Sequence, residues 1–597
     1  MRKIVSIVTI VSIVSIISLS FSSCGDYLEV EPQNMITVDK FWNEKSDVES
    51  VIASCYSTMQ SYAVISRMMI WGEFRSENLT INGEHITQDV SLERILNENL
   101  TANNSYTYWG DFYTVINRCN TIMKYAPQVA AVDPAYTESA LKAHIAEATA
   151  LRSLCYFYLI RTFRDVPYSE EPFISDDQTL DLPATTFENV LDSLIFSLEE
   201  VAGDAVWTYY SLDNVKESST EYQYNTGRIT RAAIYAMLSE MYLWKKDYDK
   251  CIYYADIVID RKKYDQELKD KQRHNEEDYS EFYDFPLIST RMSGFSNSYG
   301  AAFNDIFVDG NSDESIFELN FIKGSEGNMA SNGPVSNFFG NSGRAAFVRP
   351  SDYIASDVSL STPQVFVNKY DGRAYENFRF TGSSSSDATA SGINKYTCSS
   401  SVRMGDPNTN SFYTNSSWGT MYPTYGSSYD SRNKSNYIIY RLTDVMLLKA
   451  EALTQQITDD ASINTEADKK LRDEAFAIVT SINKRSMYQY PLKDTLNVNS
   501  YASKDKIVEL VYSERQRELM FEGKRYYDLV RRAMREGKTD YLRGKAKQRD
   551  SESASVIDSK LTRMEAIFWP YNLDELKVNK NLVQNPAFGS GENQSWE

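Results

Sequence analysis

The stretch RITRAAIYAMLSEMYLWKKDYDKCIYYADIVID, residues 228–260, decides the fold class. Small and apolar residues recur at every third or fourth position on both sides of a short polar break at residues 245–248. The inward-facing positions are Ala233, Ala236 and Leu243 before the break and Ala255, Ile257 and Ile259 after it. This spacing predicts two helices that fold back on each other across a short turn.

Similar patterns extend in both directions from this pair. Residues 140–163, ALKAHIAEATALRSLCYFYLIRTF, carry Ala and other apolar residues at helical steps, and small residues let a partner helix approach closely. The chain looks helical from Trp42 to about residue 262, and again over about 437–455, 466–486 and 505–535. The stretch from Ile567 onward looks irregular. The helix–turn–helix resembles a tetratricopeptide unit, so we expect a mainly α protein with a tetratricopeptide-like helical-repeat body, an α/α superhelix with degenerate repeats.

Residues 263–436 differ from the helical parts. They are rich in Ser, Asn, Gly and aromatic residues, and strand-like pieces such as residues 315–321 are short. Long irregular segments inside a compact protein are usually functional or disordered, so we expect a loop-rich inserted region that carries the ligand surface. The expected division is 24–262 and 437–597 for two helical parts, with 263–436 between them and residues 24–597 packed as one body.

The first 23 residues form a separate unit. Arg2 and Lys3 precede an apolar run over residues 4–21, and Ser22-Ser23-Cys24 follows. A basic start, an apolar stretch and small residues before a cleavage point predict a secretory signal peptide over residues 1–23. Cys24 directly after the small residues resembles a bacterial lipobox, although Phe21 stands where Leu is usual, and we expect Cys24 to carry a lipid.

Charge and cysteine content exclude several classes of function. The formal net charge of −20 argues against binding to nucleic acid or to anionic lipid through charge. The 42 Tyr, 27 Phe and 8 Trp favour surfaces that bind a hydrated ligand, because Tyr and Trp join an apolar ring to a polar edge. Wide spacing gives no disulfide framework, and several cysteines on apolar helical faces are expected to be small buried hydrophobes. The cysteines beyond Cys24 are Cys55, Cys119, Cys155, Cys251 and Cys398.

An ordered series of segments resembles the SusD/RagB family over nearly the whole mature chain. In chain order these are CGDYLEVEPQ (24–33), FWNEKSDVESVIASCYSTM (41–59), WGEFRSENL (71–79), YWGDFYTVINRCNTIM (108–123), AEATALRSLCYFYLIRTFRDVPY (146–168), the helix pair 227–259, YIIYRLTDVMLLKAEAL (437–453), SINKRS (481–486), ERQRELMFEGKRYYDLVRR (514–532) and IFWPYNLDELKVNKNLVQNPAF (567–588). One departure concerns a Phe-Gly-Asp-x-Pro turn of the family, in which Arg164 replaces the Gly.

The resemblance implies a non-catalytic lipoprotein without a cofactor. Such a protein faces the outside of a Bacteroidetes-like cell, anchored in the outer membrane, and binds oligosaccharide or polysaccharide. The resemblance also implies a partner, a SusC-like TonB-dependent outer-membrane barrel to which the glycan is delivered. Some RagB-like members are associated with peptide uptake, so a surface module that binds a protein or peptide remains the alternative.

Two segments combine rings with polar side chains, the pairing that a pyranose needs for stacking and for hydrogen bonds to its hydroxyl rim. The first is residues 71–109, where family members carry ligand contacts. Its candidates are Glu73, Arg75, Glu77, Asn78, Asn103, Asn104, Tyr106 and Tyr108. Trp109, which opens a helix, is expected in the core. The second segment is the inserted region, whose candidates are Phe295, Tyr299, Phe338, Phe339, Trp418, Tyr422 and Tyr425.

Enzyme chemistry has weaker support. Glu514, Glu518 and Glu522 repeat every fourth residue and could form the carboxylate pair of a glycosidase. Arginines interleave with them, which favours an ion-pair network that holds this helix to the body. His144 and Glu147 are spaced like two metal ligands, but a catalytic zinc needs a third, and the sequence offers no such cluster. We therefore expect neither a metal nor catalysis.

Overall fold

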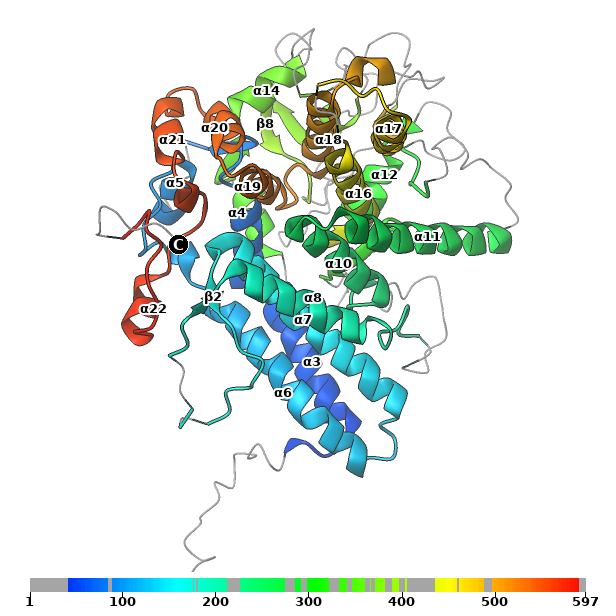
Figure 1. Ribbon diagram of the computed structural model, residues 1–597, viewed down its shortest axis with the longest axis vertical. Helices are drawn as coiled ribbons and strands as arrows, with labels where there is room; N and C mark the ends of the chain where they lie inside the picture. Colours follow the sequence, from blue (N-terminus) through cyan, green and yellow to red (C-terminus); the bar gives the residue numbers. More distant parts are fainter. Residues whose placement is uncertain are drawn as a thin grey trace, which may run out of the picture.

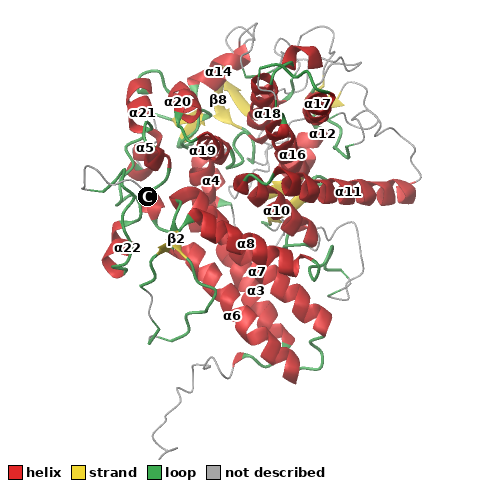
Figure 2. Cartoon of the chain, viewed as in Figure 1, coloured by secondary structure: helices red, strands yellow, loops and turns green. Residues whose placement is uncertain are grey.

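Helices build most of the protein, and the few strands are short (Figures 1 and 2). The structure is a computed structural model of the 597-residue chain. It describes residues 41–83, 89–175, 177–178, 181–210, 212, 226–273, 285–290, 298–321, 332–340, 346–359, 365–366, 371–381, 389–396, 403–404, 435–458, 461–487 and 496–589. The predicted mainly α, helical-repeat class is confirmed.

The helices before the inserted region are α3 (Lys45–Met59), α4 (Tyr62–Glu73), α5 (Val90–Leu96), η2 (Ser105–Thr107), α6 (Gly110–Val132), α7 (Glu138–Phe163), α8 (Phe187–Ala202), α10 (Arg231–Lys245) and α11 (Tyr248–Arg273). Those within it are α12 (Ala301–Phe303), η4 (Asn304–Asp309), α13 (Gly333–Phe339), α14 (Asp352–Ser359) and α15 (Arg373–Glu376). Those after it are α16 (Leu442–Gln456), α17 (Glu466–Ser486), η5 (Val498–Tyr501), α18 (Lys504–Leu519), α19 (Arg525–Glu536), α20 (Asp540–Ala546), η6 (Lys547–Arg549), α21 (Ala554–Lys560), η7 (Met564–Ile567) and α22 (Leu573–Val578).

The described strands form antiparallel pairs rather than one sheet. The pairs are β1 (Leu79–Ile81) with β6 (Val348–Pro350), β2 (Val166–Pro167) with β3 (Ala184–Thr185), β4 (Ser298–Tyr299) with β9 (Arg403–Met404), β5 (Ser315–Leu319) with β10 (Tyr437–Arg441), and β7 (Phe378–Thr381) with β8 (Thr389–Ile393). The β1–β6 pair joins the N-terminal part to the inserted region, and the β5–β10 pair joins that region to the C-terminal part.

Helix α7 is the central helix of the lower bundle in Figure 1, where it lies with α3, α6 and α8. Thr137 caps its start by accepting a hydrogen bond from the backbone N–H of Ala140 at 3.3 Å. Every residue from 146 to 163 is buried, because α6 and α8 pack against this helix. A helix that is covered all round needs no polar face, which explains the Ala-rich sequence.

The predicted helix pair is confirmed as α10 and α11. Lys246 ends α10 in a left-handed conformation with φ of 68°, which turns the chain within the polar break. After the inserted region the chain returns to the stack, since α16 packs against α11, and α17 and α18 pack against α16 (Figure 1). The helical repeat is therefore continued by segments that the sequence separates widely.

Three predicted boundaries differ from the structure. Residues 437–441 are the strand β10, not helix, because this β-branched and aromatic run pairs with β5. The predicted helix over about 505–535 is two helices, since Phe521 and Gly523 have φ of 70° and 73° and turn the chain. The stretch after Ile567 is not wholly irregular, as it contains the short helix α22.

The turn at Arg164 has unusual backbone geometry. Arg164 has φ of 70° and ψ of −75°, and the N–H of Asp165 donates to the carbonyl of Phe163 at 3.1 Å. These values define a tight γ-turn of the strained, positive-φ kind. The Arg side chain also pairs with the Asp165 carboxylate at 2.7 Å. A side chain at this position therefore carries conformational strain that glycine would avoid.

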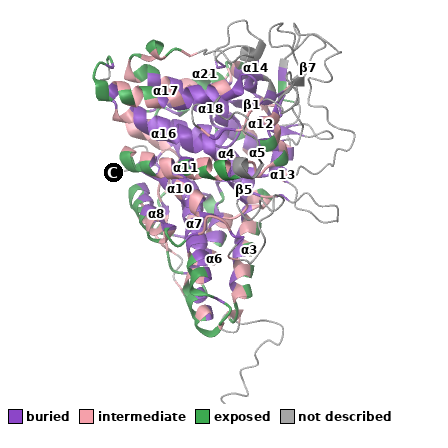
Figure 3. Ribbon diagram, turned by 90° about the vertical axis from the view of Figure 1, so that its right-hand side faces the viewer, coloured by how far each residue is buried: buried purple, intermediate pink, exposed green. Residues whose placement is uncertain are grey.

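Buried residues, purple in Figure 3, gather where the helices meet, and many of them are aromatic residues and cysteines. Trp71 packs on Phe112, Phe163 and Trp569 at centroid distances of 5.0, 5.3 and 6.4 Å. Trp109 is only 3% exposed, which confirms its predicted place in the core. Burial of the thiols is confirmed for Cys55, Cys119, Cys155 and Cys251, whereas Cys24 and Cys398 lie outside the described residues. No helix in the described ranges is both long and apolar enough to cross a membrane.

Candidate ligand-binding site

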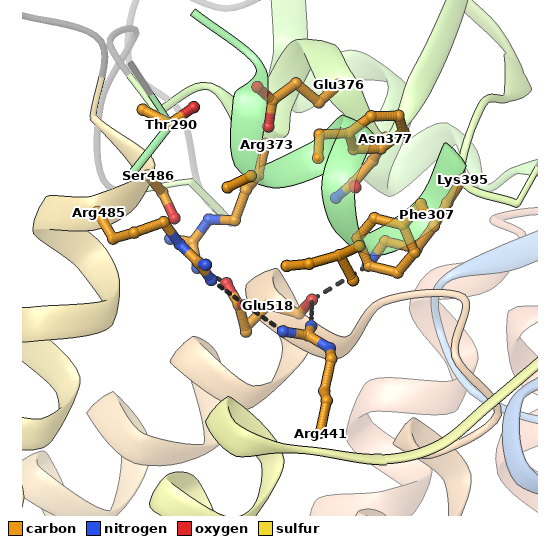
Figure 4. A pocket seen from close by; sticks show the side chains of 13 residues that line it. Thr290, Phe307, Arg373, Glu376, Asn377, Lys395, Arg441, Arg485, Ser486 and Glu518 are labelled. Atoms are coloured by element: carbon orange, nitrogen blue, oxygen red, sulfur yellow. Dashed lines mark hydrogen bonds and ion pairs between the residues drawn. The ribbon is translucent and has the colours of Figure 1, made fainter. Parts of the chain in front are cut away.

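A buried cluster of charges, which we call the polar centre, joins the inserted region to the C-terminal helices. Its members are Glu314, Asp371, Arg373, Lys395, Arg441, Arg485, Glu514, Arg517, Glu518 and Glu522. Arg373, Arg441 and Arg485 converge on the carboxylate of Glu518 (Figure 4). The prediction that the Glu514, Glu518 and Glu522 series forms an ion-pair network is confirmed.

The polar centre lacks the room that a glycan needs, and its central carboxylate, Glu518, is not a proton donor. The cavity in it has a volume of about 30 Å³, enough for water and too small for a pyranose ring. A general acid of a glycosidase needs a raised pKa. Burial acts in that direction on Glu518, but Arg485, Arg441 and Arg373 hold its pKa well below the usual range. Glu518 therefore stays ionised and serves as the shared partner of three guanidinium groups.

The two spaced residues His144 and Glu147 do not form a metal site either. His144 is buried, and its Nδ1 lies 3.0 Å from the hydroxyl of Tyr136. Glu147 is held by Arg228 at 2.6 Å and by the hydroxyl of Tyr56 at 2.6 Å. Within the part of the chain that the structure describes, there is no group of three or more potential metal ligands.

Two predicted ligand contacts in the 71–109 segment, Glu73 and Asn78, lie in the interior. A Cβ atom on Gly72 would lie 1.8 Å from the carbonyl oxygen of Gly523, so α4 and the turn before α19 meet backbone to backbone. Glu73, next in sequence, accepts hydrogen bonds from the N–H groups of Phe521, Lys524 and Arg525 and from Asn78. This carboxylate therefore caps the start of α19.

Three further candidates also have their side chains inside the protein. Arg75 is paired with Glu98 at 2.8 Å and donates to the carbonyl of Ile567. Asn104 is the N-cap of η2, and Phe339 is fully buried. Like Glu73 and Asn78, these side chains do not face solvent. Their role in ligand binding stays a prediction, and their buried positions do not favour it. Tyr299 is in β4, and Trp418, Tyr422 and Cys24 lie outside the described residues.

Tyr108 is the predicted residue that does face solvent, with 44% of its surface exposed. Its ring lies against Gly110, because a Cβ atom there would come within 2.8 Å of Cε1 of the ring. Arg67 lies below it, with its guanidinium carbon 5.8 Å from the ring centroid, and donates to the backbone carbonyl of Tyr108. Asp111 is 3.8 Å from the same guanidinium.

A second exposed ring, Tyr62, is also 44% exposed. It is the first residue of α4, directly after Ser61, whose side chain caps the helix. Its hydroxyl accepts a hydrogen bond from Nδ2 of Asn337 at 2.9 Å, and a Cβ atom on Gly333 would lie 3.2 Å from its Cδ2. Both glycine and amide belong to α13, so the inserted region meets the N-terminal helix α4 at this ring.

Tyr62, Tyr108, Arg67, Asp111 and Asn337 form what we call the tyrosine edge. Arg67 joins its two sides, since it donates to the carbonyls of both Ala63 and Tyr108. Each exposed ring is supported by a glycine, which leaves ring surface for a partner, and an amide, a guanidinium and a carboxylate lie close by. Sequence reasoning missed Tyr62, although a polar aromatic residue after a capping Ser in an otherwise apolar helix was an available signal.

Comparison with known protein families gives two matches that follow each other along the chain. Residues 26–243 match a family model described as "Starch-binding associating with outer membrane", and residues 313–588 match the model of the SusD family. The second match contains β10 and the C-terminal helices, and the first contains α4 and the start of α6.

Individual proteins agree with these matches. The chain is 25% identical over 538 residues to the SusD-like protein P38 of Formosa agariphila, covering 85% of this chain and 88% of that protein. Among solved structures, a SusD homolog from Bacteroides thetaiotaomicron has a TM-score of 0.63 at 17% identity, covering 92% of this chain and 98% of the other. A SusD superfamily protein from Bacteroides vulgatus has a TM-score of 0.62 at 16% identity, with 92% and 100% covered.

Proposed function

The chain belongs to the SusD family, and from this premise we propose that it binds oligosaccharides at the outer surface of the cell and does not cleave them. The tyrosine edge is the observation that carries the proposal. A pyranose presents an apolar face of C–H groups that stacks on an aromatic ring, while its hydroxyl rim takes hydrogen bonds. Tyr62 and Tyr108 offer the rings, and Asn337 and Asp111 offer polar groups beside them. Arg67 is buried and donates to the carbonyls of Ala63 and Tyr108, so it positions this backbone rather than the sugar.

The placement of the carboxylates agrees with binding without cleavage. The carboxylates of the polar centre are each engaged by cations in a space too small for a sugar. Among the five residues that define the tyrosine edge, Asp111 is the one carboxylate, whereas both routes of glycoside hydrolysis use two carboxyl groups. The edge is thus suited to hold a glycan by its faces and hydroxyls.

The site of action follows from the N-terminal segment and the family. We propose that residues 1–23 direct export and that Cys24 carries the lipid, which would hold the protein at the outer membrane. From there it would pass its ligand to a SusC-like TonB-dependent barrel. Growth with labelled fatty acid should label the chain, and a Cys24→Ala variant should remain unlabelled.

A glycan array tests the binding claim, with a peptide library as the second arm. The purified chain beginning at residue 25 should bind one class of oligosaccharide, and a reducing-end assay on the same mixture should find no new sugar ends. Binding to peptides alone would favour the RagB-like alternative. Release of sugar ends would contradict the non-catalytic role.

A further inference from the structure

A cavity of about 240 Å³ lies between the start of α6, loop residues 167–173 and 182, and the C-terminal segment around α22. Its lining includes Trp109, Tyr113, Tyr156, Glu575 and Val578. Trp109 lies next in sequence to Tyr108, but it points inward, 3% exposed, while Tyr108 faces solvent. The cavity is therefore a different site from the tyrosine edge.

Rings form one wall of the cavity. Trp109 and Tyr113 have centroids 5.7 Å apart, and Tyr113 and Tyr156 have centroids 6.0 Å apart. The polar ends of these rings are engaged by the protein. The hydroxyl of Tyr113 donates to the carbonyl of Pro167 at 2.7 Å, and that of Tyr156 donates to the carbonyl of Ser169 at 3.0 Å. The rings thus offer carbon surface to a ligand.

The amides that line the cavity are engaged as well. Asn117 donates to the carbonyl of Phe173 and accepts from its N–H, at 3.0 and 2.7 Å. Asn120 donates to the carbonyl of Ser169, and Asn579 donates to that of Leu182. A sugar in this space would bury hydroxyl groups with few partners, which is costly. The lining instead favours a ligand with an apolar body.

Glu575 is the one carboxylate among the described residues that line the cavity. Burial raises the pKa of this carboxyl, opposed by the side chain of Trp109, which donates a hydrogen bond to it, and Asp574 raises it further. A carboxyl group at the wall of an apolar space can accept a hydrogen bond from one hydroxyl or amine of a ligand. It therefore gives the cavity one polar contact and an orientation.

The size and the mouth of the cavity agree with a small ligand. An apolar protein cavity of about 150 Å³ stays dry and takes up benzene, so this space has room for a larger ring system. Val578, which lines the cavity, is 70% exposed, so an apolar side chain stands where the cavity meets solvent.

We infer that this cavity binds a small aromatic or branched aliphatic molecule, with the ligand's one hydrogen-bonding group directed at Glu575. The inference does not depend on glycan binding at the tyrosine edge, because the two sites share no residue.

Calorimetric titration of the purified chain with p-cresol, which has one ring and one hydroxyl, tests this inference. We expect a dissociation constant of about 0.1 to 1 mM, reasonable for eight heavy atoms. Toluene, which lacks the hydroxyl, should bind more weakly to the unchanged protein. In a Glu575→Gln variant the preference for p-cresol over toluene should shrink.

Two matched variants locate the site. Val578 and Val583 are both 70% exposed, but Val578 alone of the two lines the cavity, so both replacements should fold. Val578→Trp should block the mouth and weaken p-cresol binding at least tenfold, whereas Val583→Trp should leave it unchanged. Absence of binding at 5 mM p-cresol, or an equal effect of the two replacements, would overturn the inference.

Discussion

The polar centre and the tyrosine edge use polar residues in opposite ways. In the polar centre, Glu518 is 4% exposed and shared by three guanidinium groups from three elements. At the tyrosine edge, Tyr62 and Tyr108 are each 44% exposed and rest on glycines. The inserted region contributes to both, through Arg373 in one case and α13 in the other.

This comparison distinguishes charged residues whose partners all lie inside the protein from aromatic residues whose rings face solvent. Buried ions whose partners are all internal lose much when one partner is removed, since the other charges stay buried without compensation. Exposed rings contribute little to folding and are available to a ligand. Charge in the polar centre therefore holds the inserted region to the C-terminal helices, whereas the proposed function assigns recognition to the exposed rings of the tyrosine edge.

The largest expected effect comes from breaking the polar centre. Glu518→Ala would leave Arg373, Arg441 and Arg485 without their shared carboxylate, and we expect a loss of about 3 to 5 kcal/mol in the free energy of unfolding. Urea unfolding measures it. The control is Glu466→Ala, which removes a solvent-exposed pair with Lys469 and should leave the free energy of unfolding nearly unchanged. Equal losses in both variants would contradict the role given to the polar centre.

Glu73 sharpens the comparison, because this buried carboxylate is held by N–H groups of Phe521, Lys524 and Arg525 and by the Asn78 amide rather than by cations. Burial raises its pKa from 4.5 to about 7, opposed by these hydrogen bonds. A raised folded-state pKa means that its contribution to stability is full below pH 4.5 and is lost as pH rises through 7.

The expected loss from this residue between pH 4.5 and 8 is about 3 kcal/mol. Glu73→Gln cannot titrate, so the difference in unfolding free energy between wild type and variant should change with pH by that amount. Parallel pH profiles of the two proteins would show that Glu73 is not the titrating group.

Replacing the exposed rings tests the other side of the comparison. Tyr62→Ala and Tyr108→Ala should each weaken binding of the array-selected glycan by about five- to thirty-fold, the effect of losing one stacked ring. Their melting temperatures should stay within a few degrees of wild type. Tyr253→Ala is the matched control, because Tyr253 is 60% exposed on α11, and it should bind normally. A loss of stability without a loss of affinity would contradict the binding role proposed for these two rings.

The smallest effect concerns Arg164, which belongs to neither region. Arg164→Ala removes the pair with Asp165 and keeps a side chain at φ of 70°, whereas Arg164→Gly removes both the pair and the strain. We expect the Gly variant to be about 0.5 to 1 kcal/mol more stable than the Ala variant. Thermal unfolding of the two proteins measures this, and a less stable Gly variant would mean that the turn is not strained.

Helix periodicity predicted much of the fold because it is a local signal. The pair around Lys246 and the helix over 466–486 appear where the pattern put them. The strand over 437–441 was not predicted, because its partner β5 is more than 100 residues away. The break at Gly523 depends on contact with Gly72 and was equally invisible.

The candidate site was harder to predict. Polar residues near Trp71 resemble an exposed binding segment, but Glu73 and Arg75 find partners at Arg525, Glu98 and Ile567, which no local pattern reveals. Arginines between Glu514 and Glu522 did indicate ion pairing, although not that Arg373, Arg441 and Arg485 would supply it. Tyr108 was predicted, whereas Tyr62 required α13 to be placed beside it.

A crystal structure with an oligosaccharide from the array tests the central claim most directly. The account predicts a sugar ring against Tyr62 or Tyr108, with a hydroxyl bonded to Asn337 or Asp111 and all glycosidic bonds intact. A sugar bound elsewhere on the surface, with both rings still facing solvent, would contradict it.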